Sequence, residues 1–327
     1  MKILTPIVFT CLLVLGTSIG QAASASNPGM RMLETGNAAG AETYFKAAIQ
    51  KDPHDAEAAA DLGKAYLAQG KDENAVHWIK RAIALEPQNA NMHILLGDAY
   101  SHLVNHVSWF SKLGVAHEVL HAYQDAVKLS PNDGKAHYRL FEYYNLAPSI
   151  AGGSSNLAKA QLAELQKLSP LMADWTQADV AENHKDLKTA QSWLTDAVRL
   201  DHSGKSSYKL GILLISEQRY AEAIPVLEQG IRKDPGDADD EYQLGRACLL
   251  GKLDLDKGVV AFSRYLAMPH SWYPDTPGYP WAHYRLGQIY GLQGKADKQE
   301  SEYLAALRID PGFKRAKRAL RQLLDKR

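Results

Sequence analysis

The feature that most constrains this chain is internal repetition. Each of three equal segments carries Leu-Gly near its start, then a helical run, a Gly or polar break, a second helical run and a final Asp/Glu-Pro. A sequence that repeats one such unit predicts an array of stacked units, because a single unit cannot bury its apolar face alone. The segments align without a gap and read DLGKAYLAQGKDENAVHWIKRAIALEP (61–87), KLGILLISEQRYAEAIPVLEQGIRKDP (209–235) and RLGQIYGLQGKADKQESEYLAALRIDP (285–311).

This pattern resembles the tetratricopeptide repeat (TPR), a pair of antiparallel helices in a unit of about 34 residues. Small residues predict the points where the two helices of a unit approach closely, and the prolines end each second helix. The resemblance implies an all-α fold, a right-handed TPR solenoid of antiparallel helix pairs with a C-terminal capping helix. In the second unit the signature positions hold Leu62, Gly63, Tyr66, Gly70, Ala75, Ala82 and Pro87.

The repeat register predicts the domain organisation. We expect a TPR superhelix over residues 26–313, with a degenerate first repeat followed by about seven full ones, and a capping helix over 314–327. The basic residues of that last segment are interpreted as its polar outer face, with an anion or lipid patch as the alternative. The repeats are predicted near 26–55, 56–89, 90–133, 134–170, 171–204, 205–237, 238–270 and 280–313.

Three insertions interrupt the period, at 103–114, 147–156 and 269–280. Breaks in a solenoid are where function is often added. Two interpretations stay open for the aromatic residues of these insertions: they pack back onto the helices, or they grip a partner or a second copy of the chain. The residues concerned are Trp109, Phe110, Trp272 and Tyr273.

The N-terminus has the layout of a secretory signal peptide over residues 1–23. One early Lys precedes an apolar run that starts at Ile3, and small residues follow at Ala22, Ala23 and Ala25. We therefore expect export to the periplasm and no membrane insertion after cleavage, with an uncleaved membrane anchor as the alternative. Without the signal, Cys248 is the only cysteine, so the chain has no internal disulfide.

The charge balance argues against a nucleic-acid partner. Lys plus Arg and Asp plus Glu both number 37, so the formal net charge is zero and no long-range field recruits a polyanion.

The stretch HEVLH places His117, Glu118 and His121 in the spacing of zinc peptidases. A metallopeptidase also needs a third ligand beside a substrate cleft. Val119 and the residues four and seven positions after it form the stripe that packs inward, which turns the two histidines outward, and Glu142 falls on the opposite side. We expect no enzyme activity, no cofactor and no metal site, with His117 and His121 as the remaining candidates for metal binding.

The TPR resemblance implies that the first helices of the units line a concave groove. The repeat position that lies two residues before Leu-Gly, where a repeat has that pair, is aromatic from the fourth repeat onward, and the residue after it is mostly basic or amide. Aromatic rings with polar tips and planar guanidinium groups suit the binding of a peptide, while ordinary packing between units is the alternative. The predicted groove residues are Tyr138, Arg139, Trp175, Tyr208, Lys209, Tyr242, Arg246, Tyr284 and Arg285.

The function predicted from these patterns is that of a non-catalytic scaffold or adaptor in the bacterial envelope, which binds a protein or peptide partner in the groove. A zinc metallopeptidase centred on His117-Glu118-His121 and a self-associating structural protein are the alternatives.

Overall fold

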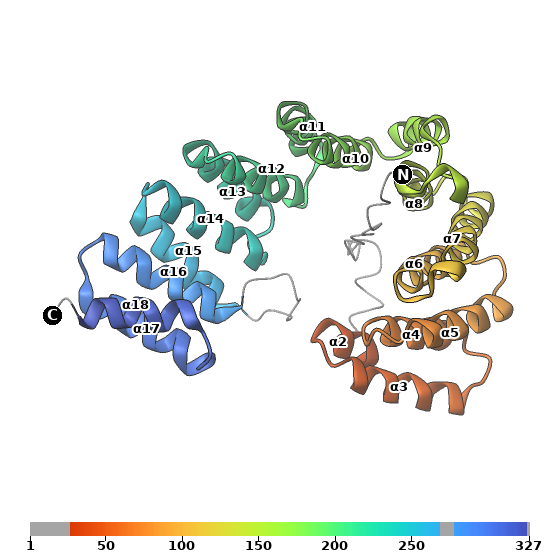
Figure 1. Cartoon of the computed structure of the whole chain (residues 1–327), viewed down its shortest axis with the longest axis horizontal. Helices are drawn as coiled ribbons and strands as arrows, with labels where there is room; N and C mark the ends of the chain where they lie inside the picture. Colours follow the sequence, from red (N-terminus) through yellow and green to blue (C-terminus); the bar gives the residue numbers. More distant parts are fainter. Residues whose placement is uncertain (1–26, 269–277, 326–327) are drawn as a thin grey trace. The chain divides into compact units, whose positions relative to one another are not determined.

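The computed structural model describes residues 27–268 and 278–325 (Figure 1). These residues form α-helices and one short 3-10 helix, η1, without a strand. The signal-peptide prediction and most of the third insertion lie outside the described residues. The helices are α2 Pro28–Glu34, α3 Ala38–Lys51, α4 Ala56–Leu67, α5 Asp72–Leu85, α6 Ala90–His106, α7 Trp109–Leu129, α8 Gly134–Leu146, η1 Ser149–Ala151, α9 Ser155–Leu168, α10 Pro170–Asn183, α11 Leu187–Leu200, α12 Lys205–Ser216, α13 Tyr220–Lys233, α14 Ala238–Gly251, α15 Leu255–Ala267, α16 Tyr279–Leu292, α17 Ala296–Ile309 and α18 Lys314–Leu324.

The chain divides into two compact units, unit 1 over Met1–Ala173 and unit 2 over Asp174–Arg327. Within each unit, consecutive helices pack against one another as antiparallel pairs, for example α4 with α5, α6 with α7 and α16 with α17. First helices of neighbouring pairs also touch, as α4 and α6 do in unit 1 and α12 and α14 do in unit 2. The predicted all-α solenoid of helix pairs with a terminal helix is confirmed.

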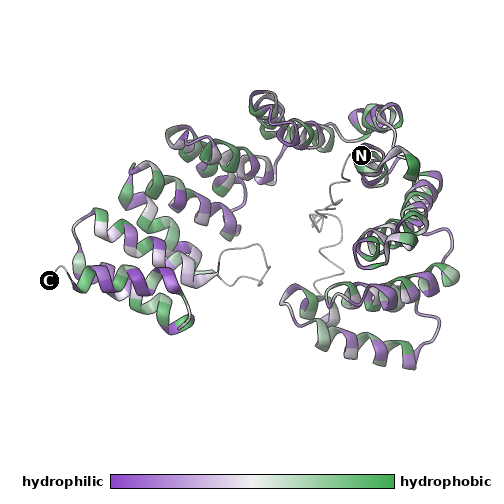
Figure 2. Ribbon diagram, in the orientation of Figure 1, coloured by the Kyte–Doolittle hydropathy of each residue, from purple (hydrophilic) through white to green (hydrophobic). Residues whose placement is uncertain are grey.

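Hydrophilic and hydrophobic residues alternate around the ribbons, as expected for helices that bury one side against their neighbours (Figure 2). None of the described helices is both long and apolar enough to cross a membrane.

The Leu-Gly signature marks a point of close contact inside a helix pair. A Cβ at Gly63 would lie 2.5 Å from Cγ1 of Ile79, and a Cβ at Gly211 would lie 2.4 Å from Cδ2 of Leu227. The missing side chain therefore lets a large residue of the second helix rest on the backbone of the first. Ala75 and Ala82, which supply the small positions of a second helix, have no exposed surface.

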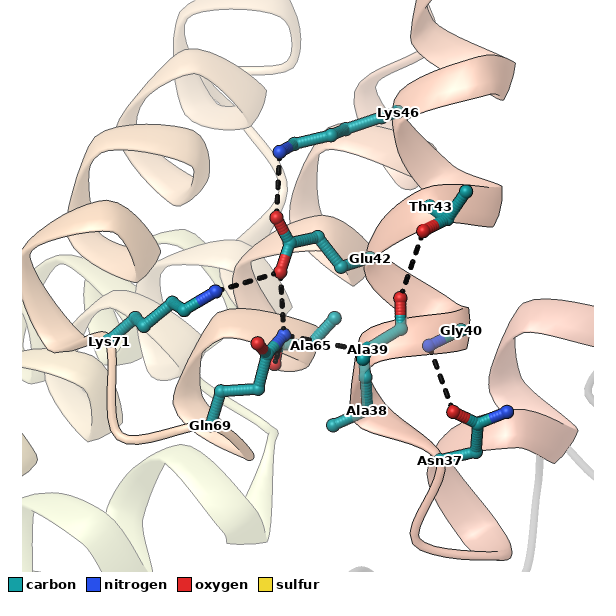
Figure 3. A network of polar contacts seen from close by, with 10 residues as sticks. All are labelled: Asn37, Ala38, Ala39, Gly40, Glu42, Thr43, Lys46, Ala65, Gln69 and Lys71. Atoms are coloured by element: carbon teal, nitrogen blue, oxygen red, sulfur yellow. Dashed lines mark hydrogen bonds and ion pairs between the residues drawn. The ribbon is translucent and has the colours of Figure 1, made fainter.

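The degenerate first repeat is joined to the second by a polar network around Glu42 on α3 (Figure 3). The Glu42 carboxylate accepts hydrogen bonds from Lys46 Nζ at 2.7 Å, Gln69 Nε2 at 2.9 Å and Lys71 Nζ at 3.0 Å. These bonds, led by the one from Lys46, lower the pKa of Glu42 to about 2. Because Gln69 and Lys71 belong to the turn between α4 and α5, the network ties that turn to α3.

The first insertion lengthens a helix pair, and the second adds one short 3-10 helix. α6 and α7 are lengthened to 17 and 21 residues. The second insertion forms η1, which is fixed by Tyr143 of α8: its hydroxyl lies 2.7 Å from the carbonyl oxygens of both Ala116 and Ala151.

An unusual acidic residue lies where α14 packs on α13. Asp240 is 1% exposed, and within the described part of the chain neither carboxylate oxygen has a hydrogen-bond partner. Its Oδ2 would lie 2.6 Å from a Cβ at Gly230, so the carboxyl group fills the space beside that glycine. Burial, with further repulsion from Asp237 and Asp239, raises the pKa of Asp240 from the ordinary value of 3.8 to about 8.

This burial predicts a pH dependence of stability. Between about pH 4 and pH 8 the folded chain keeps the proton of Asp240 and the unfolded chain loses it, so the free energy of unfolding falls as the pH rises. Asp240→Asn, which stays neutral, should remove that part of the slope and stabilise the protein at about pH 8 by a few kcal/mol, as measured by urea unfolding at about pH 5 and pH 8. The change Asp256→Asn, at an exposed acid of α15, is the control. An Asp240→Asn variant with the slope of the unmodified protein would contradict the assignment.

Candidate functional site

The first helices carry the predicted groove residues, and their side chains fall into two different electrostatic settings. In unit 1 the relevant helices are α4, α6 and α8, and in unit 2 they are α12, α14, α16 and the terminal α18, with Trp175 on α10. We call the surface formed by the aligned positions of these helices the first-helix face of each unit.

In unit 1 the Arg139 side chain of the first-helix face is paired with carboxylates of this chain. Arg139 on α8 is 6% exposed. Its Nη2 donates to Oδ2 of Asp98 on α6 at 3.3 Å, and its Nη1 donates to Oε2 of Glu142 at 2.9 Å. The Tyr138 hydroxyl donates to the other oxygen of Glu142 at 2.8 Å. Tyr138 and Arg139 thus lie close together as predicted, but they hold neighbouring carboxylates of this chain.

In unit 2 the first two aromatic residues of the predicted groove remain partly exposed. Trp175 donates from Nε1 to the hydroxyl of Ser206 on α12 at 2.7 Å, which fixes the indole beside that helix. Tyr208 lies further along α12, where burial raises the pKa of its hydroxyl to about 12. Lys209 pairs with Asp179 at 2.8 Å.

The structure places Tyr242 differently from the prediction. The residue is 2% exposed, and its ring centroid lies 5.5 Å from that of Phe262 and 5.1 Å from that of Tyr265. Gly245 permits this packing, because a Cβ there would lie 2.8 Å from the ring of Phe262. The Tyr242 hydroxyl accepts a hydrogen bond from Nε of Arg285 at 2.8 Å. Tyr242 is therefore a core residue that positions Arg285, and its ring offers no stacking surface.

Tyr284 lies at the edge of a surface hollow between α16 and α18. Its ring packs 5.6 Å from Phe313 and 5.8 Å from Tyr303, measured between centroids. The hollow has a volume of about 300 Å³ and is lined by Tyr284, Arg315, Arg318, Ala319 and Gln322.

Next to this hollow, cationic and aromatic side chains alternate. The guanidinium of Arg285 lies 5.8 Å from the ring centroids of both Tyr242 and Trp281, and that of Arg315 lies 5.0 Å from the centroid of Trp281. Arg246, on α14, donates to Oε1 of Gln243 at 3.2 Å.

Sequence reasoning missed Trp281, Arg315 and Arg318. The signal was present, because Arg318 follows Tyr284 by one repeat length of about 34 residues and so continues the same register into the terminal helix. The sequence interpretation gave that helix a polar outer face, with an anion or lipid patch as the alternative.

The HEVLH residues lie on the surface of α7. His117, Glu118 and His121 are exposed, while Val119 between them is buried. Glu142 is held by Tyr138 and Arg139. Over residues 27–268 and 278–325, no group of three or more His, Cys, Asp and Glu side chains is placed to hold a metal ion.

The aromatic residues of the first insertion do not pack back onto the helices. Trp109 is 67% exposed and Phe110 is 93% exposed. The aromatic residues of the third insertion, Trp272 and Tyr273, lie outside the described residues.

Comparison with known families supports the repeat assignment in three regions. Family profiles described as tetratricopeptide repeat match residues 32–99, 206–239 and 282–313. Among curated proteins, none matches this chain.

Solved structures with a similar arrangement of helices include yeast Tom70, with a TM-score of 0.57 at 12% identity over 92% of this chain and 64% of Tom70. The Cut9–Hcn1 hetero-tetramer of the APC/C gives 0.49 at 13% identity, over 90% of this chain and 54% of the other. A thermophilic TPR protein from Thermus thermophilus gives 0.42 at 20% identity, over 68% and 95%. The chain thus spans 54% and 64% of the lengths of the Cut9–Hcn1 chain and Tom70, and the likeness to Tom70 shows the fold.

Because Tyr242 is buried, we expect its replacement to lower the stability of the folded chain. Tyr242→Ala should lower the free energy of unfolding by about 3–5 kcal/mol, because it leaves a cavity among Phe262 and Tyr265. Tyr242→Phe, which removes only the hydroxyl that accepts from Arg285, should cost about 1 kcal/mol. Urea unfolding of both variants provides the measurement, with Leu304→Ala at an exposed site of α17 as the control. Equal, small losses for both Tyr242 variants would refute the core assignment.

Proposed function

Because the chain contains tetratricopeptide repeats, we propose that it is a non-catalytic scaffold or adaptor that binds a protein or peptide partner on the first-helix face of unit 2. Repeat solenoids of this kind generally act by presenting an extended surface to a partner. The fold alone does not select that surface, so the proposal rests on the side chains of unit 2.

The observation that carries the proposal is the combination of partly exposed aromatic and cationic side chains on successive first helices. Trp175, Tyr208 and Tyr284 offer ring surface, and Arg246 and Arg285 lie at neighbouring positions of the same face. Aromatic and Arg side chains are the residues most enriched among those that dominate binding energy, because they supply large contact area together with hydrogen-bond donors. Unit 1 offers a weaker surface, since Arg139 is buried and held by Asp98 and Glu142.

We further propose that the protein acts in the periplasm of the bacterial envelope. The support is the sequence of residues 1–23 alone, with its early Lys, apolar run and small residues.

The partner surface is tested by site-specific photo-cross-linking in cells. A photoreactive residue at position 208 should capture a discrete partner protein, and one at exposed position 304 on α17 should not.

With that partner purified, Tyr208→Ala combined with Arg246→Gln should weaken binding by about tenfold or more, because truncation of central aromatic and Arg contacts typically costs about 2 kcal/mol or above. Val260→Ala with Leu304→Ala, at exposed apolar sites of second helices, is the matched control, and helix content is checked by circular dichroism. Binding unchanged by the first variant would contradict the proposal.

Export is tested by fractionating a bacterial host. The mature chain should appear in the periplasmic fraction and begin at Ser24 by mass spectrometry, since cleavage is expected after residue 23. Leu13→Arg, which interrupts the apolar run, should leave the unprocessed chain inside the cell. An uncleaved chain in the membrane fraction would support the anchor alternative.

A further inference from the structure

The terminal helix α18 carries two separate basic stripes. Lys314, Lys317 and Arg321 are spaced i, i+3 and i+7 and share one side of the helix. Arg315, Arg318 and Gln322 have the same spacing on the adjacent side, and all three line the hollow that Tyr284 of α16 completes. A polar outer face for the last helix accounts for the first stripe. The second faces a concavity next to an aromatic cluster, and solvation alone does not explain that placement.

Within residues 27–268 and 278–325, the cations of this second stripe have no carboxylate partner, in contrast to two cations of the first-helix faces. Arg139 in unit 1 and Lys209 in unit 2 each pair with a carboxylate of this chain. Among the described residues, Arg285, Arg315 and Arg318 make no such ion pair, and the hydrogen bond of Arg285 goes to the neutral hydroxyl of Tyr242. The hollow between α16 and α18 is therefore a place where cations converge without a local counter-charge.

We propose that this hollow binds a carboxylate of an acidic peptide segment in a partner protein, through the guanidinium groups of Arg315 and Arg318. Planar guanidinium groups match carboxylates in geometry and form charge-assisted hydrogen bonds with them. Gln322 adds an amide donor, and the rings of Tyr284 and Trp281 pack against the apolar atoms of the segment. The inference rests on the proposed function and specifies the chemistry of the partner.

An extended acidic segment fits these residues better than a nucleic acid or a small anion. The chain has no excess of positive charge, whereas nucleic-acid binding depends on neutralising many phosphates. The aromatic and cationic residues continue from the hollow through Trp281 to Arg285, which exceeds the reach of one small ion. The rings at the hollow favour a ligand with apolar atoms beside its charge, as a peptide has.

The test measures by fluorescence anisotropy how the full mature chain binds a fluorescein-labelled peptide. In this peptide Glu alternates with Leu and Tyr. A peptide with Gln in place of Glu serves as the neutral probe. The unmodified protein should bind the acidic peptide and not the neutral one. Arg315→Gln with Arg318→Gln should weaken that binding by about tenfold or more, since charge-assisted contacts are the stronger hydrogen bonds. The affinity should also fall when NaCl rises from about 50 to about 500 mM.

The control variant, Lys314→Gln with Lys317→Gln, removes the same charge from the other stripe of the same helix. Its binding should change by no more than about twofold, as expected for screened charges outside the contact. Equal loss in both double variants would overturn the proposal in favour of non-specific attraction. The proposal would also be overturned if the protein did not bind the acidic peptide or bound the neutral peptide equally well. Displacement of the labelled peptide by a single-stranded oligonucleotide or inorganic phosphate, at a lower concentration than unlabelled peptide requires, would overturn it as well.

The outcome is separable from that of the proposed function. If Tyr208→Ala with Arg246→Gln abolishes binding of the cross-linked partner while Arg315→Gln with Arg318→Gln leaves it intact, the partner surface stands and the acidic-segment site fails. If the terminal double variant alone loses both the peptide and the partner, the site at α18 stands and the assignment of Tyr208 fails.

Discussion

The close approach of two helices at the Leu-Gly step is the contact on which the rest of this structure depends. At Gly63 and Gly211 the absent side chain leaves room for Ile79 and Leu227 to rest on the backbone of the first helix. The same contact recurs on α6, α14 and α16, so it fixes which side of each of these first helices is buried. The side chains that remain accessible on first helices are then aligned from one pair to the next.

That alignment explains why equal residue types acquire different roles. Arg139 on α8 meets Asp98 from the neighbouring first helix and becomes part of a buried polar cluster. Arg285 on α16 occupies the same register, but its hydrogen bond goes to the hydroxyl of Tyr242. An Arg held by carboxylates is structural, whereas an Arg whose hydrogen bond goes to a neutral hydroxyl retains the capacity to bind an anionic group. In each case the neighbouring first helix supplies the partner of the Arg, which is a carboxylate for Arg139 and a hydroxyl for Arg285.

The buried carboxyl group of Asp240 follows from the same packing rule. The aligned second helices have Ala82 and Ala306 where α13 has Gly230. The smaller residue leaves space between α13 and α14, and Asp240 fills it with a group that is neutral when buried. Gly230 and Asp240 lie ten residues apart in the sequence, and together they fill one space between α13 and α14 with a pH-sensitive group.

The repeat pattern by itself determined the all-helical fold, because Leu-Gly spacing, small residues and terminal prolines are local requirements of a helix pair. It also placed His117 and His121 on the surface, since Val119 had to face inward. The sequence did not distinguish Tyr242 from Tyr208 and Tyr284, which occupy the same position of the repeat. Only the tertiary structure decided that Tyr242 is covered by Phe262 and Tyr265, and that Arg315 and Arg318 of the last helix share a hollow with Tyr284. Periodicity defines the face on which a residue lies, but its burial depends on the size of side chains contributed by other helices, and a single repeat does not encode them.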